Sequence, residues 1–208
     1  MYMTTLTREQ VKRIIAHVEF VSKDTSLPVL NAVHIVADGY KITVSSTDRY
    51  VLAESTLTVS EWDGEAASAI IPASDITNWK NLAKTSERFQ LTLSDKWELD
   101  SFTSKATGMT VNADYPKIGS LFPEDRTLHP INPTTLSVTN LDKLGKFSRA
   151  AGIPTTERHW KIGQSKPEGR TAPLIALIEG TRALIMPIVN YNDPEAAPEG
   201  YSVSTSTN

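Results

Sequence analysis

Apolar residues recur along the chain in two periods, one typical of a helix and one typical of strands. The stretch 7–10, Thr-Arg-Glu-Gln, has the form of a capping box. The apolar residues that follow it fall on one helical face: Val11, Ile14, Ile15, Val18 and Val21. Alternating β-branched segments come next and predict three antiparallel strands, over 30–38, 40–48 and 49–60.

The same order of elements is predicted twice more. The second round has a strand over 68–73, a helix capped at Ser74, and strands over 88–95, 96–104 and 108–116. The third follows a Pro-rich connector, 116–133, and has a strand over 135–138, a helix from Asn140 to Gly152, and strands over 159–165, 173–180 and 182–189. The caps at 7, 74 and 140 are 67 and 66 residues apart, which favours three copies of one β-α-β-β-β module. A coincidence of spacing stays open as the alternative, because the copies share element order more than sequence.

This pattern predicts an α+β fold in which each helix covers one face of an antiparallel sheet and modules bury that face by joining. We expect one domain over 1–123, made of two half-domains, 1–62 and 63–123, and a third half or condensed domain over 124–192. Residues 193–208 are predicted to be a disordered tail, since they have no apolar period and many small polar residues.

Composition narrows the classes of function. The chain has 208 residues, with 39% hydrophobic and 22% charged, as in an ordinary globular protein. It has no cysteine, which excludes disulfides and thiol catalysis. The net charge of −3 shows no overall basic excess. No segment resembles a signal peptide or a membrane span, so we expect a cytoplasmic protein without membrane contact.

No catalytic constellation stands out in the sequence. The four histidines lie on different predicted elements, and there is no Gly-rich phosphate loop or nucleophile elbow. We therefore expect no catalytic residue, no metal site and no cofactor, and a protein that is not an enzyme. Asp48 is interpreted as a turn residue that bonds the local backbone. A small hydrolase that uses Asp48 and a histidine is the remote alternative, and unchanged behaviour of Asp48→Asn would remove it.

Basic residues gather on the three predicted helices. A single basic helix is usually a solvated face, but three equivalent helices lying side by side would form one basic surface that binds phosphates without reading bases. The candidate DNA contacts are Arg8, Lys12, Arg13, Lys80, Lys84, Lys143, Lys146 and Arg149.

Several short motifs resemble, in order, the bacterial DNA polymerase sliding clamp, the beta subunit of the replicase. They are "STDRYVLAE" at 46–54, "AIIPASDITNWKNL" at 69–82, "DYPKIGSLFPED" at 114–125 and "RALIMPIV" at 182–189. The similarity covers about residues 7 to 190. The first two modules resemble the middle domain of that family, and the third resembles the closing portion of its last domain.

The resemblance implies a DNA-clamp fold, with repeated half-domains, antiparallel sheets outside and helices lining a ring around duplex DNA. Such a protein is a processivity factor: it tethers DNA polymerase, and it meets polymerase and clamp loader through short peptide motifs. Twelve half-domains would need four chains of three, so a homotetramer is expected, with a trimer as the alternative. The compact length suggests a phage or mobile-element source.

The resemblance also implies a hydrophobic pocket for partner peptides. Carried over by position, its residues are Leu30, Thr47, Tyr50, Val51, Leu52, Pro116, Leu121, Leu184, Ile185, Met186, Pro187 and Ile188. Val51 and Ser120 stand where the family usually has basic residues. The competing hypothesis is a non-ring adaptor or decoy that keeps only this pocket and captures the clamp-binding motifs of replication proteins.

Overall fold

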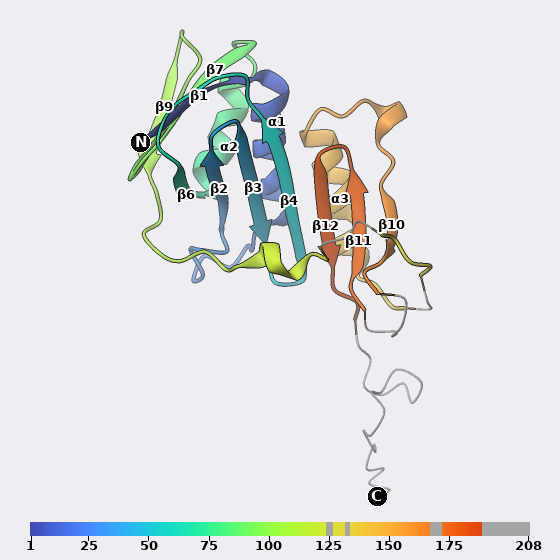
Figure 1. Cartoon of the computed structure of the whole chain (residues 1–208). Coiled ribbons are helices and arrows are strands. Elements are labelled where there is room, and N and C mark those ends of the chain that lie inside the picture. The colour runs from blue at the N-terminus through green and yellow to red at the C-terminus, as the bar shows by residue number, and fades with distance from the viewer. Residues whose placement is uncertain (124–126, 132–133, 167–171, 189–208) are drawn as a thin grey trace, which may run out of the picture.

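The structure, a computed structural model, describes residues 1–123, 127–131, 134–166 and 172–188, and builds them around two antiparallel sheets (Figure 1). The first eight strands are β1 (Tyr2–Thr7), β2 (Ala32–Asp38), β3 (Lys41–Thr47), β4 (Val51–Thr58), β5 (Trp62–Gly64), β6 (Ala67–Pro72), β7 (Arg88–Leu93) and β8 (Lys96–Asp100). The others are β9 (Lys105–Met109), β10 (Lys161–Gln164), β11 (Leu174–Ile178) and β12 (Thr181–Ile185). The helices are α1 (Arg8–Ala16), α2 (Ala73–Leu82) and α3 (Val138–Ala150), with 3-10 turns at His17–Phe20, Ile118–Leu121 and Thr155–Glu157.

The predicted modules share strands instead of forming separate sheets. The five-stranded sheet has the order β5-β1-β7-β8-β9, and the seven-stranded sheet has the order β10-β11-β12-β4-β3-β2-β6. The opening strand of each of the first two modules therefore lies in the sheet of the other. The third module extends the larger sheet, because β12 pairs with β4 and places Leu184 opposite Leu52.

The three helices form one layer on one side of the seven-stranded sheet, with α1 between α2 and α3 (Figure 1). They begin at Arg8, Ala73 and Val138, so successive starts are each 65 residues apart (73 − 8 and 138 − 73). The regular spacing predicted from the sequence is thus present in the structure.

Two apolar clusters hold these layers together. One cluster joins both sheets to α1 and α2, and its largest fully buried side chains include Trp79, Tyr2 and Phe89. The other packs α3 against α1 and the inner face of β4, β11 and β12, with Phe20 and Phe147 at its centre. α1 contributes residues to both clusters. It therefore joins the third module to the first two.

Several element boundaries differ from those predicted from the sequence. Strands β1 and β5 were not predicted, although alternate residues of β1, Tyr2, Thr4 and Leu6, are buried. The strand expected over 108–116 lies at Lys105–Met109 instead. The strand expected over 135–138 is reduced to one bridge between Thr135 and Ile188. α2 begins at Ala73 after Pro72 and α3 at Val138 after Ser137, so neither Ser74 nor Asn140 is the cap.

The capping box of α1 is confirmed. The Thr7 side chain accepts the backbone N–H of Gln10 at 3.3 Å, and the Gln10 side chain accepts that of Thr7 at 2.8 Å. The predicted tail, 193–208, and the first residues after the predicted boundary at 123 lie outside the described residues. No helix in the described ranges is long and apolar enough to cross a membrane.

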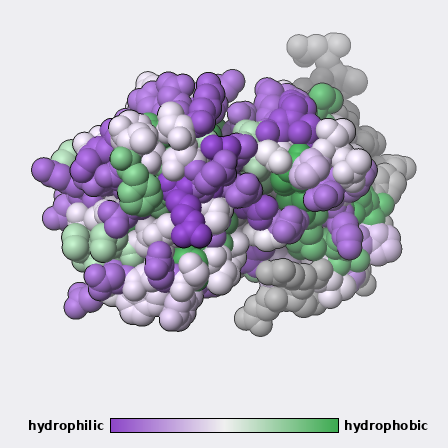
Figure 2. Space-filling view, turned by 90° about the horizontal axis from the view of Figure 1, so that it is seen from above, coloured by the Kyte–Doolittle hydropathy of each residue, from purple (hydrophilic) through white to green (hydrophobic). Residues whose placement is uncertain are grey.

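A space-filling view from above, down the ends of the strands, shows mostly hydrophilic residues over the lobe that holds β1–β9 (Figure 2). Hydrophobic residues gather on the other lobe, which α3 and β10–β12 form (Figure 2). The two lobes thus differ in the surface that they present at this end of the molecule.

Candidate functional site

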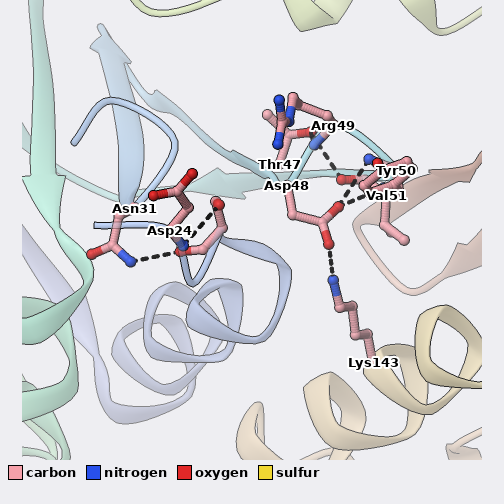
Figure 3. A network of polar contacts seen from close by, with 9 residues as sticks. Asp24, Asn31, Thr47, Asp48, Arg49, Tyr50, Val51 and Lys143 are labelled. Atoms are coloured by element: carbon pink, nitrogen blue, oxygen red, sulfur yellow. Dashed lines mark hydrogen bonds and ion pairs between the residues drawn. The ribbon is translucent and has the colours of Figure 1, made fainter. Parts of the chain in front are cut away.

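The turn between β3 and β4, residues 47–51, is fixed by Asp48. One of its carboxylate oxygens, Oδ1, accepts the backbone N–H of Tyr50 at 3.0 Å and that of Val51 at 2.8 Å (Figure 3). Arg49 adopts a φ of 82°, a conformation that non-glycine residues rarely take. The Thr47 hydroxyl stabilises it by accepting the Arg49 N–H at 3.0 Å. The turn interpretation of Asp48 is therefore confirmed.

The same aspartate joins the turn to α3. Its second oxygen, Oδ2, forms an ion pair with Nζ of Lys143, and the two side chains are only 15% and 14% exposed (Figure 3). The Tyr50 carbonyl also accepts the Met186 N–H at 2.9 Å. The turn thus connects β4, which belongs to the first module, to α3 and the segment after β12, which belong to the third.

A cleft of about 1060 Å³ lies beside this turn. It is bounded by the loop after α1, the 47–51 turn, the first turns of α2 and α3, and the segment after β12. Its lining residues are Val18, Glu19, Val21, Ser22, Lys23, Asn31, Asp48, Arg49, Tyr50, Ala73, Ser74, Thr77, Ser137, Thr139, Asn140, Lys143, Lys146, Met186, Pro187 and Ile188. Four of the predicted pocket residues, Tyr50 and 186–188, are brought together here, and Tyr50, Met186 and Ile188 are 59%, 38% and 49% exposed.

Two other predicted pocket residues lie on the outer face of the sheet, away from the helices. Leu52 and Leu184 are 4% and 3% exposed because Ile118 and Phe122 of the connector cover them. Arg182 fixes this cover: its guanidinium lies 4.2 Å from the centre of the Phe122 ring and pairs with Glu54 at 2.7 Å. Leu52 and Leu184 thus form a closed apolar contact beneath the connector.

The remaining predicted pocket residues are placed differently. Val51 and Ile185 are fully buried in the cluster between the sheet and α3, so they are core residues and do not line a surface pocket here. The register explains this correction, since side chains alternate between the two faces of a strand. Leu30 is half-buried, Thr47 is 3% exposed, Pro116 is exposed and Leu121 is 59% exposed.

Half of the predicted DNA-contact residues pair with acids of this chain. Arg8 pairs with Glu87 at 2.7 Å, and Lys146 with Asp142 at 2.9 Å. Arg13 donates to the Glu179 carbonyl at 2.7 Å, and Lys143 is held by Asp48. These four therefore have an acidic partner within the chain, and the role of all eight in DNA contact stays a prediction. Over the ranges that the structure describes, four make no ion pair: Lys12, Lys80, Lys84 and Arg149.

A buried histidine lies between the helix layer and the junction of the modules. His17 is fully buried, and its ring nitrogens are hydrogen-bonded to the hydroxyls of Ser46 and Ser55, each at 2.8 Å. Ser55 in turn bonds Thr181 of β12 at 2.7 Å. Burial, with a smaller contribution from Arg13, lowers the pKa of His17 to about 3. His17 is therefore a neutral core residue that links β3, β4 and β12.

This network predicts a loss of stability in acid. The pKa of His17 is lowered from 6.5 to about 3 on folding, so as pH falls below 6.5 the unfolded chain gains this proton and the folded chain does not. The free energy of unfolding should drop by about 2 kcal/mol between pH 6.5 and 5 from this residue alone. Urea unfolding at both pH values checks this, with His17→Gln as the comparison. An equal drop in H17Q and in the parent would contradict the assignment.

A second histidine, His34 of β2, contacts the residue that precedes the connector. The His34 ring stacks on Tyr115 with centroids 4.5 Å apart, and its Nε2 is hydrogen-bonded to Ser68 at 2.8 Å. Burial lowers the pKa of His34 to about 4 and raises the pKa of the Tyr115 hydroxyl. His34 is thus a hydrogen-bonded strand residue. Within the described residues, no three His, Asp or Glu side chains gather as a metal site.

Comparison with known proteins identifies the fold and the family. Residues 5–117, more than half of the chain, match the family model of the DNA polymerase III beta subunit, central domain. The chain belongs to this family. The structure agrees, since its fold resembles the DNA polymerase III beta subunit of Thermotoga maritima with a TM-score of 0.70 at 12% identity, over 90% of this chain and 65% of that one.

Other members of the family give the same result. A beta sliding clamp of Micrococcus luteus is 32% identical over 121 residues, which is 56% of this chain and 39% of that protein. The pol III beta of Caulobacter crescentus has a TM-score of 0.68 at 12% identity, over 89% of this chain and 65% of that one. This chain thus spans less than two thirds of the length of these relatives.

Several residues of the cleft were not predicted from the sequence. Lys23, Arg49 and Asn140 line it, and none was named as a site residue. The sequence predicted Asn140 as the cap of α3, which would place its side chain outside the helix. The cap is Ser137, three residues earlier, so Asn140 lies in the first turn. For Lys23 and Arg49 no local pattern distinguishes a cleft residue from an ordinary surface charge.

Proposed function

We propose that the chain is a DNA polymerase processivity factor that surrounds duplex DNA as part of a homo-oligomeric ring. The observation that carries this proposal is the single layer of α2, α1 and α3 on one side of the seven-stranded sheet. Lys80 and Arg149 are exposed on this layer, Lys84 is exposed just after the end of α2, and all three are free of ion pairs within the described residues. Membership in the DNA polymerase III beta family supports the same function.

The chemistry of this surface suits a sliding contact. Lysine and arginine side chains neutralise phosphates without reading bases, so a duplex can move past them. A ring holds its partner on the DNA by topology, which turns rebinding of the polymerase into an event at high effective concentration. The proposed function requires no catalytic residue and no cofactor.

Replication proteins are proposed to dock in the cleft through short peptide motifs. Tyr50, Met186 and Ile188 offer exposed apolar area there, beside the junction of β4 and β12. Two or three buried Leu or Phe anchors contribute about 1.5–3 kcal/mol each, which after the cost of ordering the peptide gives micromolar affinity. DNA polymerase and the clamp loader are the proposed partners.

The helix layer predicts a specific effect on DNA affinity. Replacing Lys80 and Lys84 together by Glu should weaken binding to a duplex oligonucleotide and lower the slope of log K against log salt by about two. Peptide binding should stay unchanged, because neither residue lines the cleft. Fluorescence anisotropy over a salt series measures both quantities.

A matched double variant controls for total charge. Lys41 and Lys96 are exposed on β3 and β8, away from the helix layer, so Lys41→Glu with Lys96→Glu changes the charge equally. We expect this control to retain the parental salt slope. Equal loss of DNA affinity in the two double variants would show that the helix layer is not the DNA surface.

A second candidate function is a non-ring adaptor or decoy that only captures clamp-binding motifs. Pairing with acids reduces the free positive charge of the helix layer, and this favours the second function. The paired residues are Arg8, Arg13, Lys143 and Lys146. The two functions differ on circular DNA. A ring should stay on a closed circle and leave once the circle is cut, whereas an adaptor should not be retained on either form.

A further inference from the structure

Two aromatic side chains are exposed beside each other at one edge of the five-stranded sheet. Tyr40, in the turn between β2 and β3, is 60% exposed, and Trp62, the first residue of the edge strand β5, is 41% exposed. Their ring centroids are 6.3 Å apart and their planes meet at 89°. The two rings thus form two walls of an apolar corner on the surface. This pair is called the aromatic corner.

Buried neighbours hold the aromatic corner in place. The ring of Tyr2 is fully buried and lies parallel to the ring of Trp62, with centroids 6.4 Å apart. Its hydroxyl donates to the Gly39 carbonyl at 2.8 Å, and the Tyr40 carbonyl accepts the Val59 N–H at 2.9 Å. The backbone that carries both rings is therefore fixed before any partner binds, which lowers the conformational cost of binding.

The aromatic corner lies apart from the cleft and from the helix layer. Glu65, just after β5, donates its N–H to the Met1 carbonyl at 3.1 Å, so this edge lies at the N-terminus, across the molecule from β10–β12 (Figure 1). Neither ring lines the cleft, and neither belongs to a helix. A partner bound at the aromatic corner would leave both other surfaces free.

Acidic side chains dominate the two segments that carry these rings. Residues 38–41 and 59–65 hold four carboxylates and one cation, Lys41. Two of the acids flank Trp62 in the chain, and another lies opposite Lys41 at the base of the turn between β2 and β3. All four are exposed, and none makes an ion pair in the part of the chain that the structure describes: Asp38, Glu61, Asp63 and Glu65. The surface around the aromatic corner is therefore negative.

Aromatic rings among unpaired carboxylates suit a cationic ligand. The face of an aromatic ring attracts a cation, and an arginine side chain both stacks on such a ring and pairs with carboxylates. The same carboxylates repel phosphate groups, so a nucleic acid or an anionic lipid does not suit this surface. A basic protein segment supplies the charge and also the apolar stems that the rings can cover.

We propose that the aromatic corner is a second docking surface, and that it binds an arginine-rich segment of a partner protein. One guanidinium lies in the corner between the rings of Tyr40 and Trp62, and the surrounding carboxylates attract the other arginines of the segment. This interaction does not depend on what the cleft binds.

A labelled basic peptide tests this surface. The probe is a fluorescein-labelled decapeptide of alternating Arg and Ser, with Lys and Gln counterparts, and fluorescence anisotropy at low salt measures its affinity. The Arg peptide should bind about threefold more tightly than the Lys peptide, because only the guanidinium stacks well on the rings. The Gln peptide should not bind. Equal binding of the Arg and Lys peptides, or no binding of the Arg peptide, would overturn the inference.

Alanine variants test the two rings. Tyr40→Ala and Trp62→Ala should each weaken binding of the Arg peptide about fivefold. Tyr40 is the more exposed of the two, so Y40A keeps the test valid if W62A disturbs the fold. Phe102→Ala is the matched control, because Phe102 is 67% exposed in the turn between β8 and β9, toward the opposite edge of the sheet. Parental affinity in Y40A, or an equal loss in F102A, would overturn the inference.

Charge variants test the carboxylates. Glu61→Gln combined with Asp63→Asn should weaken binding of the Arg peptide about fivefold. Asp114→Asn combined with Glu157→Gln changes the total charge equally at exposed positions elsewhere, and this control should change the affinity less than about twofold. An equal loss in the two double variants would show that the net charge of the protein attracts the peptide, which contradicts the proposal.

Discussion

Replacing Phe147 by Ala is expected to lower the free energy of unfolding by about 3–5 kcal/mol. The Phe147 ring is fully buried between α3 and its neighbours, with ring centroids of Phe20, His17 and Trp160 at 5.4, 5.5 and 5.9 Å. Removing it leaves a cavity at the place where α3 packs on α1. Urea unfolding followed by circular dichroism measures the change.

A residue on the same helix provides the control. Val138 opens α3 and is 79% exposed, so Val138→Ala should change the free energy of unfolding by less than about 0.5 kcal/mol. If Phe147→Ala cost no more than V138A, the packing of the third module onto α1 would not contribute to stability.

The second large effect is expected at Asp48. Asp48→Ala removes two hydrogen bonds to the backbone of the turn and leaves Lys143 unpaired where it is only 14% exposed. Breaking such a buried pair from one side costs about 3 kcal/mol. Asp48→Asn should cost less, because its side-chain oxygen can still accept from the turn. The loss arises from the turn and the ion pair.

A double-mutant cycle separates the ion pair from the turn. Replacing Lys143 by Met in the D48A background should recover part of the lost stability, since no unpaired charge then remains. Asp142 and Lys146 form an exposed pair on the same helix, and Asp142→Ala should leave the unfolding midpoint within experimental error. Additive effects of D48A and K143M would show that the two side chains do not interact.

Local patterns predicted the helices and most of the strands because the signals are contained in a few neighbouring residues. The capping box at Thr7 is an example, as is the buried stripe of Ile76 and Trp79 on α2. Strand β1 was missed because it has only six residues and its pairing with β7 bridges more than 80 residues. A short polar strand of this kind is recognised only once its partner is in place.

The candidate site could be predicted only in part for a related reason. Resemblance placed Tyr50 and Met186 in one pocket, and the structure brings both to the cleft. Resemblance could not predict on which face of the sheet the side chains of Val51 and Ile185 lie. A shift of one residue in a strand turns every side chain to the other face. The pairing of Lys143 with Asp48 joins residues 95 positions apart, and no spacing rule reaches that far.

The central proposal is that this chain works as an assembled ring. The described residues hold three modules, and we propose that several copies close the ring around a duplex. Sedimentation velocity at micromolar concentration measures the mass of the assembly directly. We expect a particle of four times the 22.9 kDa of one chain, with three times as the alternative ring. A stable monomer at that concentration would contradict it.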